Sequence, residues 1–199
     1  MRRILLVVAA LALATSAHAN LVTNGTFDAG LAGWTATGGA GVQSGNPFGL
    51  PTSPSGEPEV GCISSWGGDW GGPLGSISQT VNMVGPGTLS GEIFAAAHSG
   101  DAWRNVATEV LWNGGVVASL ARDADPNKWA QDFPWVTFAV PVTGIGANEL
   151  KVNYTVHFAE WSWTSADNLQ VDAIPEPGSL LALGTGLVGL VGIALRRRK

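Results

Sequence analysis

The sequence is poor in cysteine and in basic residues. Cys62 is the only cysteine among 199 residues, so no disulfide can form within the chain, and a buried apolar role suits Cys62 better than a reactive one. Only ten residues are Lys or Arg, and six of them lie within residues 1–19 and 175–199. Between those ends, four basic residues face fourteen acidic ones, a net charge of about −10. A domain this acidic repels phosphate backbones, so we expect no nucleic-acid partner.

Catalytic signatures are also missing from the sequence. It has no G-x-S-x-G, no H-E-x-x-H, no C-x-x-C and no phosphate-binding glycine loop with lysine. Outside the N-terminal segment the only histidines are His98 and His157. His98 precedes Asp101, a pairing that would suit a hydrolytic triad, but a turn after a strand explains it equally well. We therefore predict a protein without enzymatic activity, and a secreted hydrolase that uses His98 is an alternative.

The N-terminus has the three parts of a secretory signal peptide. Met1-Arg2-Arg3 is positively charged, Ile4 to Ala14 is apolar, and Ala17-His18-Ala19 places small residues around a cleavage position. We expect residues 1–19 to be removed, so that the mature chain begins near Asn20. A retained membrane helix is the weaker interpretation, because the apolar part is too short.

The C-terminus contains a second membrane-directed segment. Pro175-Glu176-Pro177 is stiff and extended, because proline fixes φ and disfavours helix in the residue before it. Leu180 to Leu195 is apolar and uncharged. As a helix it is about 24 Å long, against a hydrocarbon core of about 30 Å. Arg196-Arg197-Arg198-Lys199 is a basic cluster that stays on the cytoplasmic side of a membrane. The alternative is a buried helix of a soluble domain, but this helix has no polar face.

These three features in this order resemble the PEP-CTERM sorting tail of bacterial exported proteins, which would cover residues 175–199. The resemblance implies recognition by exosortase, a membrane peptidase-transferase that acts near the Pro-Glu-Pro sequence. It also implies Gram-negative export, with a transient anchor in the inner membrane and the domain on the periplasmic side. The domain would then reach the cell surface or the extracellular matrix. The transmembrane helix would be temporary, as the hydrophobic tail is in GPI signals.

Residues 20–174 have the pattern of one all-β domain. Short alternating runs bounded by Gly, Pro and Asn dominate, and the segment Glu149–Val156 alternates strictly. Asn113-Gly114 lies between two such runs and predicts a hairpin, because both residues accept positive φ. A long loop is expected over Gly38–Pro58. Antiparallel strands at this spacing predict a two-sheet sandwich, most simply a jelly roll. The expected strands are Leu21–Thr23, Val60–Ser65, Ser76–Met83, Gly87–Ala97, Asn105–Trp112, Val116–Arg122, Val136–Val142, Glu149–Phe158 and Asn168–Ala173.

Three motifs of this domain resemble galactose-binding-like carbohydrate-binding modules. Asn24-Gly25-Thr26-Phe27-Asp28 resembles their opening segment, Gly75 to Gly87 their next core strand and turn, and Ser165 to Val171 their closing strand. In such modules, acids of the opening and closing motifs help to hold a structural Ca²⁺, so the resemblance implies Asp28 and Asp167 as calcium ligands. A hard cation would also stabilise a domain that lacks disulfides. The alternative is that both acids only form turns.

Nine tryptophans lie between the two chain ends, and some are placed to bind sugars. Trp66, Asp69 and Trp70 share a glycine-rich loop, and Trp161 begins a second aromatic segment. Indoles stack on the apolar faces of sugar rings, while carboxylates bind the hydroxyls. We therefore predict that Trp66, Asp69, Trp70 and Trp161 bind extracellular polysaccharide, with packing inside the sandwich as the alternative.

Trp112 and Trp135 lie inside strand patterns, so for these two we predict packing. Taken together, the sequence predicts an exported, non-enzymatic structural or polysaccharide-associated protein of the cell surface. A calcium-stabilised carbohydrate-binding module with a defined glycan pocket is the first alternative.

Overall fold

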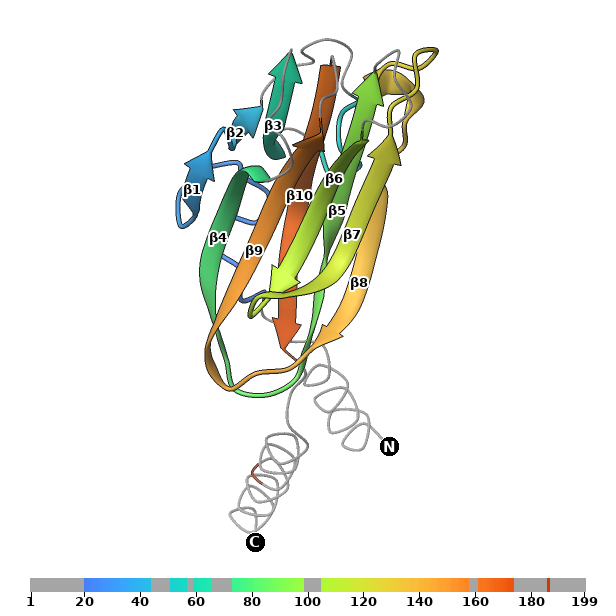
Figure 1. Cartoon of the computed structure of the whole chain (residues 1–199). Helices are drawn as coiled ribbons and strands as arrows, with labels where there is room; N and C mark the ends of the chain where they lie inside the picture. Colours follow the sequence, from blue (N-terminus) through green and yellow to red (C-terminus); the bar gives the residue numbers. More distant parts are fainter. Residues whose placement is uncertain are drawn as a thin grey trace, which may run out of the picture.

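The fold is a sandwich of two antiparallel sheets, each with five strands (Figure 1). The computed structural model describes residues 20–43, 51–56, 59–65, 73–98, 105–157 and 161–173, together with Gly186. One sheet has the strand order β1-β4-β9-β6-β7, and the other has the order β2-β3-β10-β5-β8. The elements are β1 (Thr35–Gly38), β2 (Gly41–Gln43), β3 (Glu59–Ser65), β4 (Pro73–Met83), β5 (Gly87–His98), β6 (Asn105–Trp112), β7 (Gly115–Asp123), the 3-10 helix η2 (Ala130–Asp132), β8 (Val136–Val142), β9 (Gly146–His157) and β10 (Trp161–Ala173).

The main core lies between the two sheets and follows from the alternation along each strand. In β6, Val106 and Val110 are fully buried while their neighbours are partly exposed. In β9, Leu150, Val152 and Tyr154 have no exposed surface, as the strict alternation of this segment predicts. Each such aliphatic side chain contributes about 1.5–3 kcal/mol when it leaves water. The predicted all-β, two-sheet sandwich is therefore confirmed.

The hairpin predicted at Asn113-Gly114 is also confirmed. Asn113 has a φ of 50° and Gly114 a φ of 81°, and the pairing of Trp112 with Gly115 closes a two-residue loop between β6 and β7. Positive φ at both positions matches the right-handed twist of the strands that the loop joins.

The predicted strand at Leu21–Thr23 is wrong: the Leu21 N–H still donates to the Val171 carbonyl of β10, but at Thr23 a side chain replaces the neighbouring strand. The segment forms turns, and only Asn20 makes an isolated bridge, to Asp172. Gln79 of β4 reaches the segment from the sandwich: its Oε1 accepts from the Thr23 N–H at 2.7 Å, and its Nε2 donates to the Thr23 carbonyl at 2.9 Å. The same nitrogen donates to the carbonyl of Gly33 at 2.9 Å.

Three further differences from the sequence prediction concern strands without an apolar pattern. β1 was not predicted, because all four of its residues are exposed. β2 lies inside the segment Gly38–Pro58, which was predicted as loop throughout. β10 begins at Trp161, where the prediction began at Asn168, because its first half buries Ser and Thr residues that carry no hydrophobic periodicity.

The antiparallel order gives the sandwich two distinct ends. At the loop end, residues 66–72, 99–104, 124–135 and 158–160 connect the strands. At the tail end, the connections are the short segments 84–86, 113–114 and 143–145, and β10 finishes at Ala173 beside Gly87. β10 has 13 residues, so the two ends are separated by about 40 Å.

A second, smaller core covers the outer face of the β2-β3-β10-β5-β8 sheet near the loop end. Phe94 and Ala96 of β5 and Trp163 of β10 are fully buried there against Ala130 and Phe133. Trp135 packs against this cluster, and its Nε1 donates to the carbonyl of Pro51 at 2.8 Å. The main core includes Trp112, which is 8% exposed. The packing predicted for Trp112 and Trp135 is therefore confirmed.

Gly25 occupies a position that has no space for a side chain. A Cβ there would lie 1.9 Å from the carbonyl oxygen of Leu169 in β10, and the Gly25 carbonyl accepts from the Leu169 N–H at 3.0 Å. We expect Gly25→Ala to push the opening segment away from β10 and to lower the free energy of unfolding by about 1–3 kcal/mol. Denaturant unfolding measures this loss. Gly41→Ala is the control, since nothing lies within 4 Å of its Cβ position, and an equal loss in both variants would contradict the explanation.

Both predicted membrane-directed segments lie outside the described residues. These are the signal peptide at 1–19, with Ala17 and Ala19, and the tail from Pro175 to Lys199, where Gly186 alone is described and is helical. Within the described part of the chain, no helix has the length and hydrophobicity that crossing a membrane requires.

Candidate functional sites near the loop end

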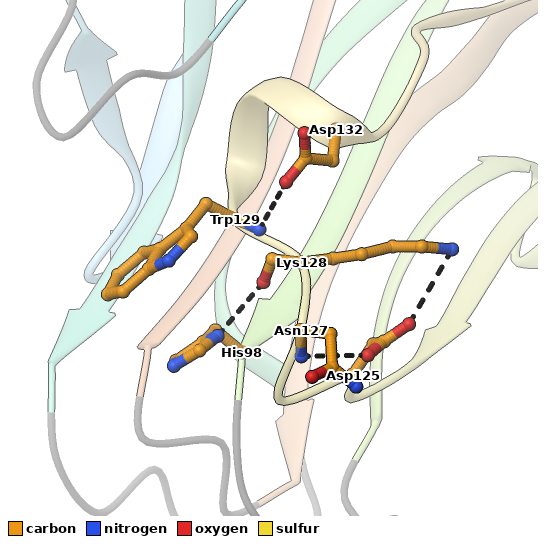
Figure 2. Close-up of polar contacts among 6 residues, drawn as sticks. All are labelled: His98, Asp125, Asn127, Lys128, Trp129 and Asp132. Atoms are coloured by element: carbon orange, nitrogen blue, oxygen red, sulfur yellow. Dashed lines mark hydrogen bonds and ion pairs between the residues drawn. The ribbon is translucent and has the colours of Figure 1, made fainter.

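An exposed tryptophan stacks on a histidine at the loop end (Figure 2). The ring centroids of Trp129 and His98 are 4.1 Å apart, and the ring planes are within 13° of parallel. His98 is the last residue of β5, and its Nδ1 lies 2.9 Å from the carbonyl oxygen of Lys128. A carbonyl can only accept, so Nδ1 donates this hydrogen bond. The histidine is thereby held in place under an indole that remains 43% exposed.

A polar turn surrounds this stack. Asp125 Oδ1 accepts from the Asn127 N–H at 2.9 Å, and Asp132 Oδ2 accepts from the Trp129 N–H at 2.8 Å (Figure 2). Lys128 Nζ lies 3.5 Å from Asp125 Oδ2. The Asn127 backbone N–H, followed by the charge of Lys128, holds the pKa of Asp125 below its ordinary value. Asp125 is therefore ionised at neutral pH.

The exposed indole of Trp129 suits a sugar ring, because it offers a flat apolar surface on which the ring can stack. The carboxylates of Asp125 and Asp132 and the ammonium group of Lys128 point away from the indole (Figure 2). The sequence prediction did not include Trp129, because it lies in an irregular loop with no motif around it. The only indication of a binding role for Trp129 was its position in the connection between β7 and β8. That position suggests ligand binding only after the fold shows that the connection lies at the loop end.

A second polar cluster, here called the acid cluster, consists of Asp167, Glu92, Ser53, Ser55 and the carbonyl of Gly56. Asp167 of β10 and Glu92 of β5 are cross-strand partners and are 1% and 6% exposed. Ser53 Oγ contacts both Asp167 Oδ2 and the Gly56 carbonyl. Ser55 Oγ lies 2.6 Å from Asp167 Oδ2 and 3.0 Å from Glu92 Oε2. Residues 51–56 thus close over two buried acids.

The acid cluster has more acceptors than protons. Each serine hydroxyl has one proton, yet each lies within hydrogen-bond range of two oxygens that can only accept while the acids are ionised. A protonated Asp167 carboxyl group or a shared cation would each relieve this shortage of protons. Burial is the main cause that raises the pKa of Asp167, and the nearby charge of Glu92 adds to it.

The donor atoms of the acid cluster fit a calcium ion. Carboxylate, hydroxyl and carbonyl oxygens are the ligands of a hard cation, and Ca²⁺ takes six to eight of them in flexible geometry. Among the described residues, no group of three or more His, Cys, Asp or Glu side chains surrounds one point, so serine and carbonyl oxygens would complete the set. Glu92, Ser53 and Ser55 had no signal in the sequence, because none of them belongs to a recognisable motif.

Of the two predicted calcium ligands, only Asp167 lies in the acid cluster. Asp28 is exposed, and its Oδ2 accepts from Thr26 Oγ1 at 2.7 Å. The opening segment reaches β10 through Gly25 and Leu169, two residues beyond Asp167. A calcium role for Asp28 stays a prediction.

Of the predicted sugar-binding residues, the structure places the backbone of Trp161 at the same end of the sandwich as Trp129. Trp161 is the cross-strand partner of both Ser65 and His98, so the backbone brings the ends of β3 and β5 beside the start of β10. Trp66, Asp69 and Trp70 follow β3 directly but lie outside the described residues. Trp163, two residues after Trp161, is fully buried in the second core and is not available to a ligand.

Comparison with known proteins identifies the tail and the fold separately. Residues 173–199 match the family model of the PEP-CTERM protein-sorting motif. No curated protein is significantly similar to the chain in sequence.

Solved structures similar to this chain include three carbohydrate-binding modules. The carbohydrate-binding module TmCBM61, solved with β-1,4-galactotriose, has 17% sequence identity and a TM-score of 0.50, over 77% of this chain and 97% of that one. A CBM22-1 xylan-binding domain from Paenibacillus barcinonensis has 17% identity and a TM-score of 0.45, over 80% and 97% of the two chains. A CBM35 from the same organism has 21% identity and a TM-score of 0.40, over 72% and 95%.

At these identities the similarity establishes the fold and nothing about a ligand. The tail match covers the Pro-Glu-Pro sequence, the apolar run and the basic cluster together. The chain therefore carries a PEP-CTERM protein-sorting motif, which marks an exported protein sorted to the cell surface, after a β-sandwich with the fold of carbohydrate-binding modules.

Proposed function

We propose that this chain is an exported bacterial protein that exosortase processes and delivers to the cell surface or extracellular matrix. There its β-sandwich acts as a non-enzymatic structural component that associates with polysaccharide. The position of the motif supports the proposed sorting step. The motif begins at Ala173, the residue where β10 ends. The stiff Pro175-Glu176-Pro177 sequence thus follows the folded domain directly, within reach of a peptidase.

The stage before processing is a transient anchor in the inner membrane. The apolar run from Leu180 to Leu195 spans the bilayer, and the four basic residues from Arg196 to Lys199 remain cytoplasmic. The sandwich then lies on the periplasmic side until the peptidase acts. The signal peptide at residues 1–19 is consistent with this topology, because it would direct the same domain across the membrane.

The mass of the mature protein from its native host tests the proposal. With exosortase present, we expect a chain that begins near Asn20 and ends near Pro175–Pro177. Without exosortase, we expect the mass to extend through Lys199. A chain that runs through Lys199 in both strains would show a permanent anchor and would contradict the sorting step.

A second candidate function is a calcium-stabilised carbohydrate-binding module with a defined glycan pocket. Two observations favour it: the acid cluster fits a hard cation, and the stack of Trp129 on His98 offers a sugar platform at the loop end. This candidate differs from the first in the bound calcium ion and in a defined pocket for the sugar. It shares the sorting route.

A further inference from the structure

The tail end of the sandwich presents exposed aliphatic side chains. Ile145, in the turn between β8 and β9, is 86% exposed, and Val84, in the turn between β4 and β5, is 74% exposed. Val116, directly after the β6–β7 turn, is 54% exposed. Single exposed apolar residues are ordinary on protein surfaces. Here three of them lie at one end, each in or beside one of its three turns.

The turn that carries Ile145 is braced from both sides. Trp112 Nε1 donates to the Thr143 carbonyl at 3.0 Å. Asn148 Nδ2 donates to the Gly146 carbonyl at 2.9 Å, and Asn148 Oδ1 accepts from Asn113 Nδ2 at 2.9 Å. These contacts stabilise the turn in the conformation in which Ile145 is exposed.

The distribution of charge distinguishes the tail end from the rest of this acidic domain. Its three turns, residues 84–86, 113–114 and 143–145, contain no charged residue. The four connections at the loop end contain five acidic and two basic residues. An anionic membrane surface repels acidic protein surfaces. Of the two ends of the sandwich, the tail end is thus the one whose connections carry no negative charge against such a membrane.

The chain itself brings the tail end close to the membrane. β10 ends at Ala173, whose cross-strand partner Gly87 lies three residues after Val84. Six residues, 174–179, separate Ala173 from the apolar run that begins at Leu180. At full extension they span about 20 Å, so the exposed turns cannot move far from the bilayer.

We propose that, before the tail is cleaved, the tail end of the sandwich rests on the phospholipid surface and inserts Val84 and Ile145 among the headgroups. The loop end with Trp129 then points away from the membrane, about 40 Å from it. This inference rests on the proposed membrane stage of the tail. It adds an orientation that the sorting motif by itself does not specify.

Depth-dependent fluorescence quenching of the full-length chain in vesicles tests this orientation. The vesicles contain phosphatidylethanolamine and phosphatidylglycerol with a nitroxide-labelled lipid. The single cysteine is first removed by Cys62→Ser, and a dye is then attached at Thr143→Cys, beside Ile145, or at the distal site Asn127→Cys. We expect the nitroxide lipid to quench the dye at position 143 several-fold more than the dye at position 127.

The combined variant Val84→Ser plus Ile145→Ser is expected to reduce the quenching at position 143 to the level at position 127. Val42→Ser is the matched control, because Val42 is 39% exposed in β2, outside the tail-end turns, and it should change nothing. Equal quenching at both dye positions, in protein that floats with the vesicles, would overturn the orientation and leave the anchor intact. Protein that does not float would overturn the anchor itself, and the orientation with it.

Discussion

Replacing Asp167 by asparagine is expected to remove all calcium dependence from the stability of the domain. A Ca²⁺ ion bound at the acid cluster, as proposed, would stabilise the folded state by about 2.7 kcal/mol at a free concentration one hundred times its dissociation constant. Asp167 contacts both serines of the cluster and would be the central ligand of the cation. In Asp167→Asn, a neutral amide would replace this carboxylate, and the cation would lose its central ligand. The variant should therefore gain nothing when calcium is added.

The same carboxyl group predicts how stability depends on pH when calcium is chelated. Burial raises the pKa of Asp167 in the folded protein above its ordinary value of 3.8, so the folded state holds this proton more tightly than the unfolded state. This tighter binding of the proton stabilises the folded state fully below pH 3.8, and the stabilisation is lost as pH rises through the raised pKa of Asp167. Asp167→Asn should flatten this part of the pH profile, because asparagine does not titrate.

Thermal unfolding with calcium and with a chelator, from acid to neutral pH, measures both effects. Asp125→Asn is the control, since it also neutralises an acid that forms only surface contacts. Asp28→Asn tests the ligand role that the sequence implied for this exposed residue. A calcium response of equal size in the wild type and in Asp167→Asn would contradict a cation site at the acid cluster. So would a wild-type protein that is indifferent to the chelator.

Trp129→Ala is expected to weaken polysaccharide binding about 30-fold, which corresponds to about 2 kcal/mol for the loss of a central aromatic contact. The indole is the exposed member of the stack with His98, and no packing in the core depends on it. The thermal stability of the domain should therefore change little. Binding to a glycan array or to extracellular polysaccharide from the host measures the effect.

Two further variants define what the loop end does. Trp66→Ala combined with Trp70→Ala tests the loop after β3, and Val116→Ala at the tail end is the control that should bind normally. Unchanged binding in Trp129→Ala, together with a loss in the Trp66 and Trp70 variant, would move the sugar site to that loop. Turnover of an ester or glycoside by the purified protein, abolished by His98→Ala, would instead support the hydrolase alternative.

Features that depend only on neighbours along the chain were predictable without the structure. The sorting motif is linear, so its three parts were readable in order. The hairpin at Asn113-Gly114 depends only on the φ angles of two residues. The alternation in β9 predicts which side chains are buried, because a strand has a period of two.

Strands without hydrophobic periodicity could not be predicted from the sequence. β1 and β2 lie at sheet edges and have no hydrophobic pattern. Leu21–Thr23 had a strand composition, but the backbone of Thr23 hydrogen-bonds to the Gln79 side chain, 56 residues away in the sequence. Such a tertiary contact overrides local propensity.

The candidate sites were decided by tertiary structure. Ser53 and Asp167 are 114 residues apart in sequence, and only the pairing of β10 with β5, under the cover of residues 51–56, brings them to the same point as Glu92. The stack of Trp129 on His98 likewise joins a loop to the end of a distant strand. The physical reason is that ligand binding needs several groups around one point in space. Strand order sets which distant residues meet there, and local periodicity contains no information about that order.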